Sequence, residues 1–119
     1  MVIAMGTSKH IVASMFDFIG NLKESDSVIF VTGNSEDITH AEKLLKSKNI
    51  YKEVNKSQFD VFIDTNLKNC EDVFYNKHVP SYLLQCEDNM NCKSMVVNRC
   101  ISWNAFIEEI EYIRKKVSL

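Results

Sequence analysis

Proline and glycine are scarce in this sequence, which has one Pro and three Gly among its 119 residues. This scarcity excludes a collagen-like repeat and argues against a flexible linker, because both need these residues in quantity. Long apolar runs are missing as well, and none approaches the roughly 20 residues that span a bilayer. The apolar stretch at the start is too short for a signal peptide and has no basic lead-in. We therefore expect a cytoplasmic protein with no membrane partner.

An excess of charge of either sign is also missing. The chain has 14 basic and 16 acidic side chains, which gives a net charge of −2 with His neutral. Proteins that coat nucleic acid carry a strong positive field, so we do not expect a nucleic-acid partner. With 45% hydrophobic and 25% charged residues, the composition is that of an ordinary globule, and we assign residues 1–119 to a single domain.

The four cysteines form no Cys-x-x-Cys pair. This excludes the thioredoxin-type redox motif and the paired thiols of a zinc knuckle. A chain of this length builds a hydrophobic core without disulfide bonds, so we expect reduced thiols. A link between Cys86 and Cys92 stays open as an alternative.

Two hydrophobic periods alternate along the chain. Short apolar runs rich in β-branched and aromatic residues indicate strands, and apolar residues spaced three to four positions apart indicate helices. We predict strands at residues 2–5, 27–32, 59–64 and 81–85, and weaker ones at 50–54 and 95–97. We predict helices at residues 9–24 and 67–76, one opened by Asn34 and stopped by Asn49, and one capped by Ser102. The last helix presents one apolar face made of Trp103, Phe106, Ile110, Ile113 and Val117.

This alternation predicts a three-layer α/β fold of the Rossmann-like kind, with a mostly parallel sheet and helices on both faces. Ligands of such sheets bind at the carboxyl ends of the strands. Small polar residues follow three of the predicted strands at that edge, where helix-start amides and hydroxyls form a cradle for an anion. The candidate ligand-binding residues in these loops are Gly6, Thr7, Ser8, Thr32, Gly33, Asn34, Asp64 and Asn66.

The order of these segments over residues 28–117 resembles the haloacid dehalogenase-like (HAD-like) phosphatase and nucleotidase superfamily. Residues 29–34 are similar to the family's second motif, a strand that ends in a phosphate-holding hydroxyl, here that of Thr32. Residues 59–64 are similar to its fourth motif, in which a strand delivers acids to magnesium. Residues 98–103 resemble the Arg and Ser-Trp ending of small nucleotidase-like members. The resemblance also implies a lysine that neutralises the phosphate, for which Lys56 is the candidate and Lys52 the alternative.

The family's chemistry needs a nucleophilic Asp at the end of the first strand and a second Asp two residues later. Met5 and Thr7 stand at these two positions here. The fourth motif keeps only Asp64, whereas magnesium prefers several hard oxygen ligands. The resemblance therefore implies a HAD-like domain without a cap domain, without catalytic residues and without a cofactor, in which Asp64 is the only residual metal candidate. Such a domain binds a phosphorylated small molecule or a protein partner.

Three alternatives remain open at the level of the sequence. One is a small magnesium-dependent phosphatase or nucleotidase with relocated acids, for example Asp17 or Asp64, which needs Mg²⁺ as its cofactor. Another is an Alba-like nucleic-acid-binding domain, suggested by the order of elements in the first 60 residues. The third is a protein-interaction module or homodimer, whose face would use the exposed parts of Tyr75, Tyr82, Trp103 and Tyr112.

Overall fold

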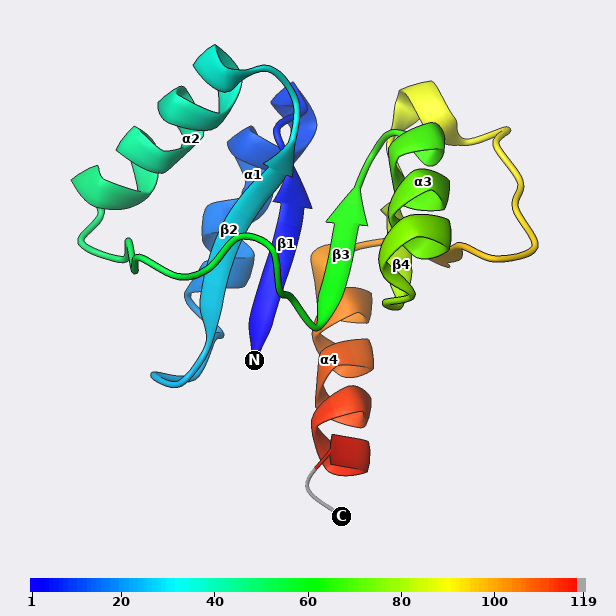
Figure 1. Ribbon diagram of the computed structural model, residues 1–119. Coiled ribbons are helices and arrows are strands. Elements are labelled where there is room, and N and C mark those ends of the chain that lie inside the picture. Colours follow the sequence, from blue (N-terminus) through cyan, green and yellow to red (C-terminus); the bar gives the residue numbers. More distant parts are fainter. Residues whose placement is uncertain (118–119) are drawn as a thin grey trace.

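A sheet of parallel strands forms the centre of the molecule (Figure 1). The structure is a computed structural model that describes residues 1–117. Within that range the sheet contains β1 (Val2–Gly6), β2 (Ser27–Thr32), β3 (Val61–Asp64), β4 (Ser81–Leu84) and β5 (Asn98–Cys100). The strand order is β2-β1-β3-β4-β5, and every neighbouring pair runs parallel. All carboxyl ends therefore lie at one edge of the sheet.

Helices follow the first, second, third and fifth strands. They are α1 (Lys9–Ile19), α2 (Ser35–Ser47), α3 (Leu67–Lys77) and α4 (Trp103–Val117), with a short 3-10 turn, η1 (Glu87–Asn89), after β4. A polar side chain caps each of the first three helices, because Ser8, Asn34 and Asn66 accept a hydrogen bond from a backbone N–H in the first turn. These caps fix the point at which each helix leaves the sheet edge.

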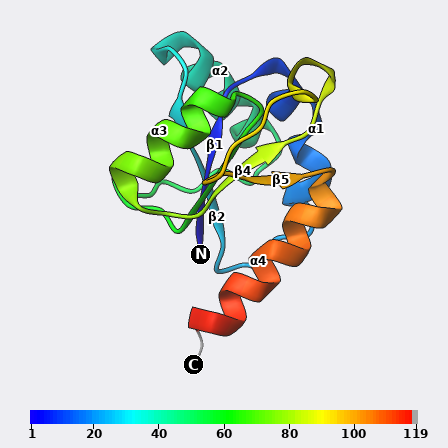
Figure 2. The ribbon, with the colours of Figure 1, turned by 90° about the vertical axis from the view of Figure 1, so that its right-hand side faces the viewer.

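The helices divide unequally between the two faces of the sheet. Helices α1 and α4 lie on one face and α3 lies on the other (Figures 1 and 2). Helix α2 stands at the β2 edge, where Ala41 and Leu45 join the same core cluster as α1 and α4. The chain between α2 and β3 then crosses the α3 face in front of β2 and β1 (Figure 1). An extended segment therefore covers the part of this face that lies beside α3.

Alternate strand residues supply the two cores. On β1, Ile3 and Met5 enter the larger cluster, whereas Ala4 enters the smaller one on the α3 face. The larger cluster includes an aromatic stack in which Phe18 and Trp103 lie 4.9 Å apart, ring centroid to ring centroid, at an interplanar angle of 18°. Phe106 joins this stack at 5.3 Å from Phe18. Such stacks contribute about 0.5–1.5 kcal/mol beyond their buried area, so they anchor α4 to α1.

The predicted α/β architecture is confirmed, and the sheet is entirely parallel rather than mostly so. The strand predicted at residues 50–54 is wrong, because this stretch has no strand partner and crosses the sheet as coil. The strand predicted at 95–97 is also wrong, since pairing with β4 begins at Asn98. The first helix ends at Ile19 instead of residue 24, because the backbone N–H of Asn21 turns to the carbonyl of Phe18.

The inward face predicted for the last helix is confirmed for its first residues. Phe106 and Ile110 are buried, and Trp103 and Ile113 pack against the same cluster. The side chain of Val117 lies outside the described part of the structure.

Candidate functional site

The three loops that follow β1, β2 and β3 are in direct contact at the carboxyl edge of the sheet. The hydroxyl of Thr7 donates to the carbonyl of Thr32 at 3.0 Å. The hydroxyl of Thr32 donates in turn to the Asp64 carboxylate at 3.4 Å, and Thr65 Oγ1 donates to Ser8 Oγ at 2.7 Å. We call residues 6–8, 32–34 and 64–66 the strand-end cluster. Of the loop residues that the sequence nominates, these contacts join Thr7, Ser8, Thr32 and Asp64, whereas the side chains of Asn34 and Asn66 cap α2 and α3.

The strand order places this cluster at a topological switch point. The chain goes from β1 outward to β2 and then returns past β1 to β3. As a result α1 and α3 leave the neighbouring strands β1 and β3 on opposite faces of the sheet (Figure 2). This is the flavodoxin-like order of doubly wound sheets, and ligands of open α/β sheets bind where the connections diverge in this way.

Two glycines allow the loops to come this close. A Cβ at Gly6 would lie 2.2 Å from the carboxyl carbon of Asp64, a distance that no side chain tolerates. Gly33 has φ +114°, and a Cβ there would lie 2.0 Å from Thr7 Oγ1. Glycine is the residue that adopts such a φ without steric cost. Both glycines therefore shape the cluster, and neither contributes a ligand atom from a side chain.

Asp64 lies at the centre of the cluster and is 1% exposed. Its carboxylate accepts hydrogen bonds from the backbone N–H of Thr65 at 2.7 Å and from the Asn69 side-chain amide at 2.9 Å, besides the one from Thr32. Burial raises the pKa of this carboxyl above its usual value of 3.8, and the hydrogen bonds from Asn69, Thr65, Asn66 and Thr32 oppose that rise. Asp64 therefore connects the loops from inside and is not presented to solvent.

The predicted lysine does not join the cluster. Lys56 forms an ion pair with Glu42 on α2, and it belongs to the segment that leads into the amino end of β3. The alternative, Lys52, donates to the carbonyl of Asp26 at 3.0 Å, just before β2. Both lysines serve the segment that crosses the sheet. Sequence reasoning misplaced them because the path of this segment depends on where α2 packs.

The acids of the proposed alternative enzyme do not meet either. Asp17 is exposed on α1 and Asp64 is buried in the cluster. Within residues 1–117 no group of three or more His, Cys, Asp or Glu side chains is arranged to hold a metal ion. Met5, which stands at the position of the nucleophile, is fully buried in the core. Thr7, at the position of the second acid, holds the backbone of Thr32.

Cationic and amide groups that the sequence analysis did not single out lie next to the cluster. Lys9 and His10 are exposed and open α1 directly after Ser8. The first N–H groups of an α-helix have no partner within the helix, and Ser8 satisfies that of Ile11. The backbone N–H groups of residues 9 and 10, at the start of α1, have no acceptor within the helix and lie next to the cluster. The capping pattern around Ser8 was the signal that could have identified them.

The loop after β4 is also attached to the cluster. The Asn89 side-chain amide donates to the carbonyl of Thr65 at 3.0 Å and to that of Leu84 at 2.8 Å. Arg99 on β5 donates to the side-chain oxygen of Asn89 at 3.4 Å and to the carbonyl of Asn89 at 3.1 Å. Asn89 and Thr65 are 24 positions apart in sequence, so no local sequence pattern predicts their contact. These hydrogen bonds hold the Thr65 side of the cluster in place.

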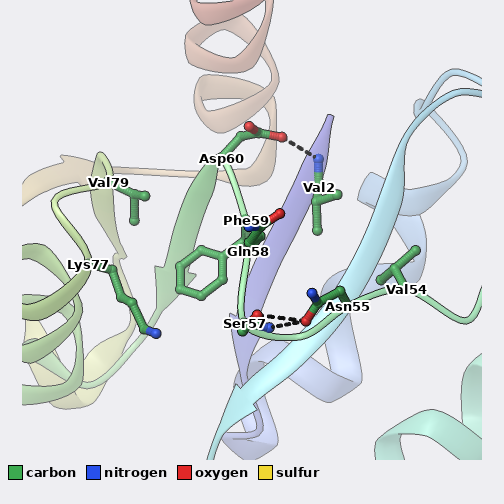
Figure 3. Close-up of a pocket in the computed structure, with 9 residues that line it drawn as sticks. All are labelled: Val2, Val54, Asn55, Ser57, Gln58, Phe59, Asp60, Lys77 and Val79. Atoms are coloured by element: carbon green, nitrogen blue, oxygen red, sulfur yellow. Dashed lines mark hydrogen bonds between the residues drawn. The ribbon is translucent and has the colours of Figure 1, made fainter.

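A second hollow lies at the opposite edge of the sheet (Figure 3). Its volume is about 440 Å³, and its walls include Val2, the first residue of β1, with Phe59 and Val79 from the segments that lead into β3 and β4. Asp60 at this edge accepts a hydrogen bond from the backbone N–H of Val2 at 2.7 Å, and Lys77 reaches toward the hollow from the end of α3 (Figure 3). The amino ends of the strands lie far from the cluster, so this hollow is separate from it.

The aromatic face suggested for a partner does not assemble. Tyr82 is 4% exposed, and Trp103 is stacked on Phe18 while its indole N–H donates to Ser14 Oγ at 2.8 Å. Tyr75 and Tyr112 are exposed, but they belong to α3 and α4 on opposite faces of the sheet (Figure 2). All four cysteines are free thiols, as expected.

Comparison with protein-family models, with curated proteins and with solved structures gave no match. In the described residues no helix combines the length and the apolar character that crossing a membrane requires. The function is therefore inferred from the geometry of the site.

Proposed function

We propose that this chain is a catalytically silent HAD-like domain that binds a phosphorylated small molecule at the strand-end cluster. The observation that carries the proposal is the convergence of the three loops at the switch point between β1 and β3. Backbone amides at the starts of α1 and α3 point toward this edge, and helix starts attract phosphate through these amides and the helix dipole. We also propose a cytoplasmic location. The four free thiols support it, because the cytosol keeps cysteines reduced.

The electrostatics of the cluster agree with an anionic ligand. Lys9 and His10 stand at the start of α1, and Lys68 is the second residue of α3. The one carboxyl of the cluster, Asp64, is buried, and burial raises its pKa. Its carboxylate is occupied by hydrogen bonds from Thr65, Asn69 and Thr32 inside the cluster, so it is not presented to an incoming anion.

The absence of turnover follows from the residues at the family's catalytic positions. A phosphoryl group is transferred to an enzyme only by a nucleophile that reaches the phosphorus atom. The Met5 side chain is a buried thioether, and the Thr7 hydroxyl already donates to Thr32. The bound phosphate ester is therefore held and not cleaved.

A thermal-shift titration with inorganic phosphate tests the proposal. A ligand that binds the native state raises the melting temperature by mass action, with a gain that grows with the logarithm of its concentration above Kd, so wild-type protein should gain stability with phosphate but not with matched chloride. Lys9→Glu should abolish the gain, because it places an anion at the start of α1. Lys77→Glu, the matched control at the other edge of the sheet, should retain it.

A phosphate-release assay completes the test. With magnesium and a panel of phosphate monoesters, release should stay at the level of buffer alone. Turnover that disappears in Asp64→Asn would instead support the magnesium-dependent phosphatase. Stabilisation by phosphate that is lost in Lys77→Glu would move the binding site to the second hollow and end the present assignment.

A further inference from the structure

A groove of about 500 Å³ lies between α1 and α2 and begins at Thr7. Thr7 belongs both to this groove and to the strand-end cluster, where its hydroxyl donates to Thr32. The groove is therefore continuous with the proposed phosphate site. Its volume falls within the range of about 300–1,000 Å³ that is typical of small-molecule sites.

The floor of the groove is apolar. Val12 and Phe16 contribute from α1 and Leu44 from α2, and all three side chains are half-buried. Ala13 is the small residue that leaves the space open on the α1 side. Helix α1 rises about 1.5 Å per residue, so the floor extends roughly 10 Å from the start of the helix to Phe16. That length accommodates one aromatic ring beyond a phosphate.

The rim of the groove carries charges that oppose each other. Lys9 lies on α1, and Asp37 and His40 lie on α2. Within residues 1–117 Lys9 forms no ion pair. Lys9 is the first residue of α1 and lies next to the phosphate site, whereas Asp37 on the α2 rim repels a second anionic group. The groove therefore suits the uncharged part of a ligand, whose phosphate would lie next to Thr7 and the start of α1.

We infer that the α1–α2 groove holds the flat apolar body of the ligand whose phosphate the strand-end cluster binds, so the ligand class is the aryl phosphate monoesters. This inference rests on the proposed function, since it needs the phosphate at the cluster. The ring packs over Phe16 between Val12 and Leu44, and the ester oxygen joins it to the phosphate at Thr7.

Calorimetric titration with two probes, inorganic phosphate and phenyl phosphate, tests the inference. Burial of roughly 60 Å² of ring surface is enough for about a tenfold gain in affinity, so wild-type protein should bind phenyl phosphate at least about tenfold more tightly than inorganic phosphate. Ala13→Phe fills the groove and should remove this advantage while leaving the affinity for inorganic phosphate unchanged. Asn76→Phe adds the same ring to an exposed position on α3 and should keep the advantage.

A second groove variant keeps the test valid if Ala13→Phe does not fold. Leu44→Ala removes apolar floor from the α2 side and should reduce the advantage of phenyl phosphate at least threefold. Equal affinities for the two probes in wild-type protein, or an advantage that survives in both groove variants, would overturn the inference and leave the phosphate site standing. Failure of both probes to bind would overturn the proposed function and the inference together.

Discussion

Gly6 and Asp64 face each other at the carboxyl ends of the two neighbouring strands β1 and β3. A Cβ on Gly6 would lie 2.2 Å from the carboxyl carbon of Asp64 and 2.4 Å from its Oδ1. Asp64 is 1% exposed, so its side chain has no solvent into which it could withdraw. The switch point of the sheet is thus built from one residue without a side chain and one buried acid.

Gly6→Ala should destabilise the protein by about 1–3 kcal/mol, the usual cost of overpacking a core position. The added methyl group meets the Asp64 carboxylate, so the cost should shrink when Asp64 is also shortened. Urea denaturation of Gly6→Ala, Asp64→Ala and the double variant measures this coupling. Losses that simply add in the double variant would show that the two residues are not in contact.

Gly33→Ala should cost about 2–4 kcal/mol in the free energy of unfolding, because it combines a strained positive φ with a collision at Thr7. Thr7→Ala removes the Oγ1 atom with which the new Cβ collides. In that background the cost of Gly33→Ala should fall to the strain alone, about 1–2 kcal/mol. The measurement is the same denaturation series, and an unchanged cost in the Thr7→Ala background would argue against the contact.

The stability of the protein should depend on pH through Asp64 in a direction opposite to that of an ion-paired carboxylate. Burial raises the pKa of Asp64 in the folded state above 3.8, so the folded state binds a proton more tightly than the unfolded state does. Its contribution to stability is full below pH 3.8 and is lost as the pH rises through the raised pKa.

Asp64→Asn does not titrate, and the comparison with it isolates this contribution. The free energy of unfolding of wild-type protein, minus that of Asp64→Asn, should decrease as the pH rises above 3.8 and then level off. Chemical denaturation at a series of pH values from 3 to 8 measures the difference. A difference that increases over this interval would mean that the carboxylate is stabilised in the fold.

Asp26 connects the start of β2 to the last helix. Its side chain is 1% exposed and pairs with the Arg114 guanidinium on α4, and its Oδ2 accepts the backbone N–H of Lys23 at 2.8 Å. Removal of one partner of a buried ion pair costs about 3–5 kcal/mol, so Asp26→Asn should destabilise the protein by about this amount. Glu108→Gln, an exposed acid on α4, should change the stability by less than about 0.5 kcal/mol.

The sequence was sufficient to place the loops of Thr7, Thr32 and Asp64 at one edge, because apolar strands that alternate with helices make a parallel sheet whose carboxyl ends coincide. It was not sufficient for the parts that depend on long-range packing. Helix α2 joins the α1 side of the core through Leu45, and this sends the following segment across the other face and carries Lys56 away from the cluster.

The last strand was misplaced for a related reason. Residues 95–97 have the apolar character of a strand, but Val97 is used to cover the α3 face of the sheet. Pairing with β4 starts at Asn98 and includes Arg99, whose side chain holds Asn89. Polar edge residues of this kind give no hydrophobic signal, so their strand becomes visible only in the folded chain.

The proposed function places the bound phosphate where α1 and α3 begin. The most direct test is a titration of isotope-labelled protein with inorganic phosphate, followed by the backbone amide signals in two-dimensional NMR. We expect saturable shifts that are largest for Lys9, His10 and Lys68, with no comparable change at Phe59 or Lys77. Saturable shifts confined to Phe59 and Lys77, or no saturable shift at any amide, would contradict it.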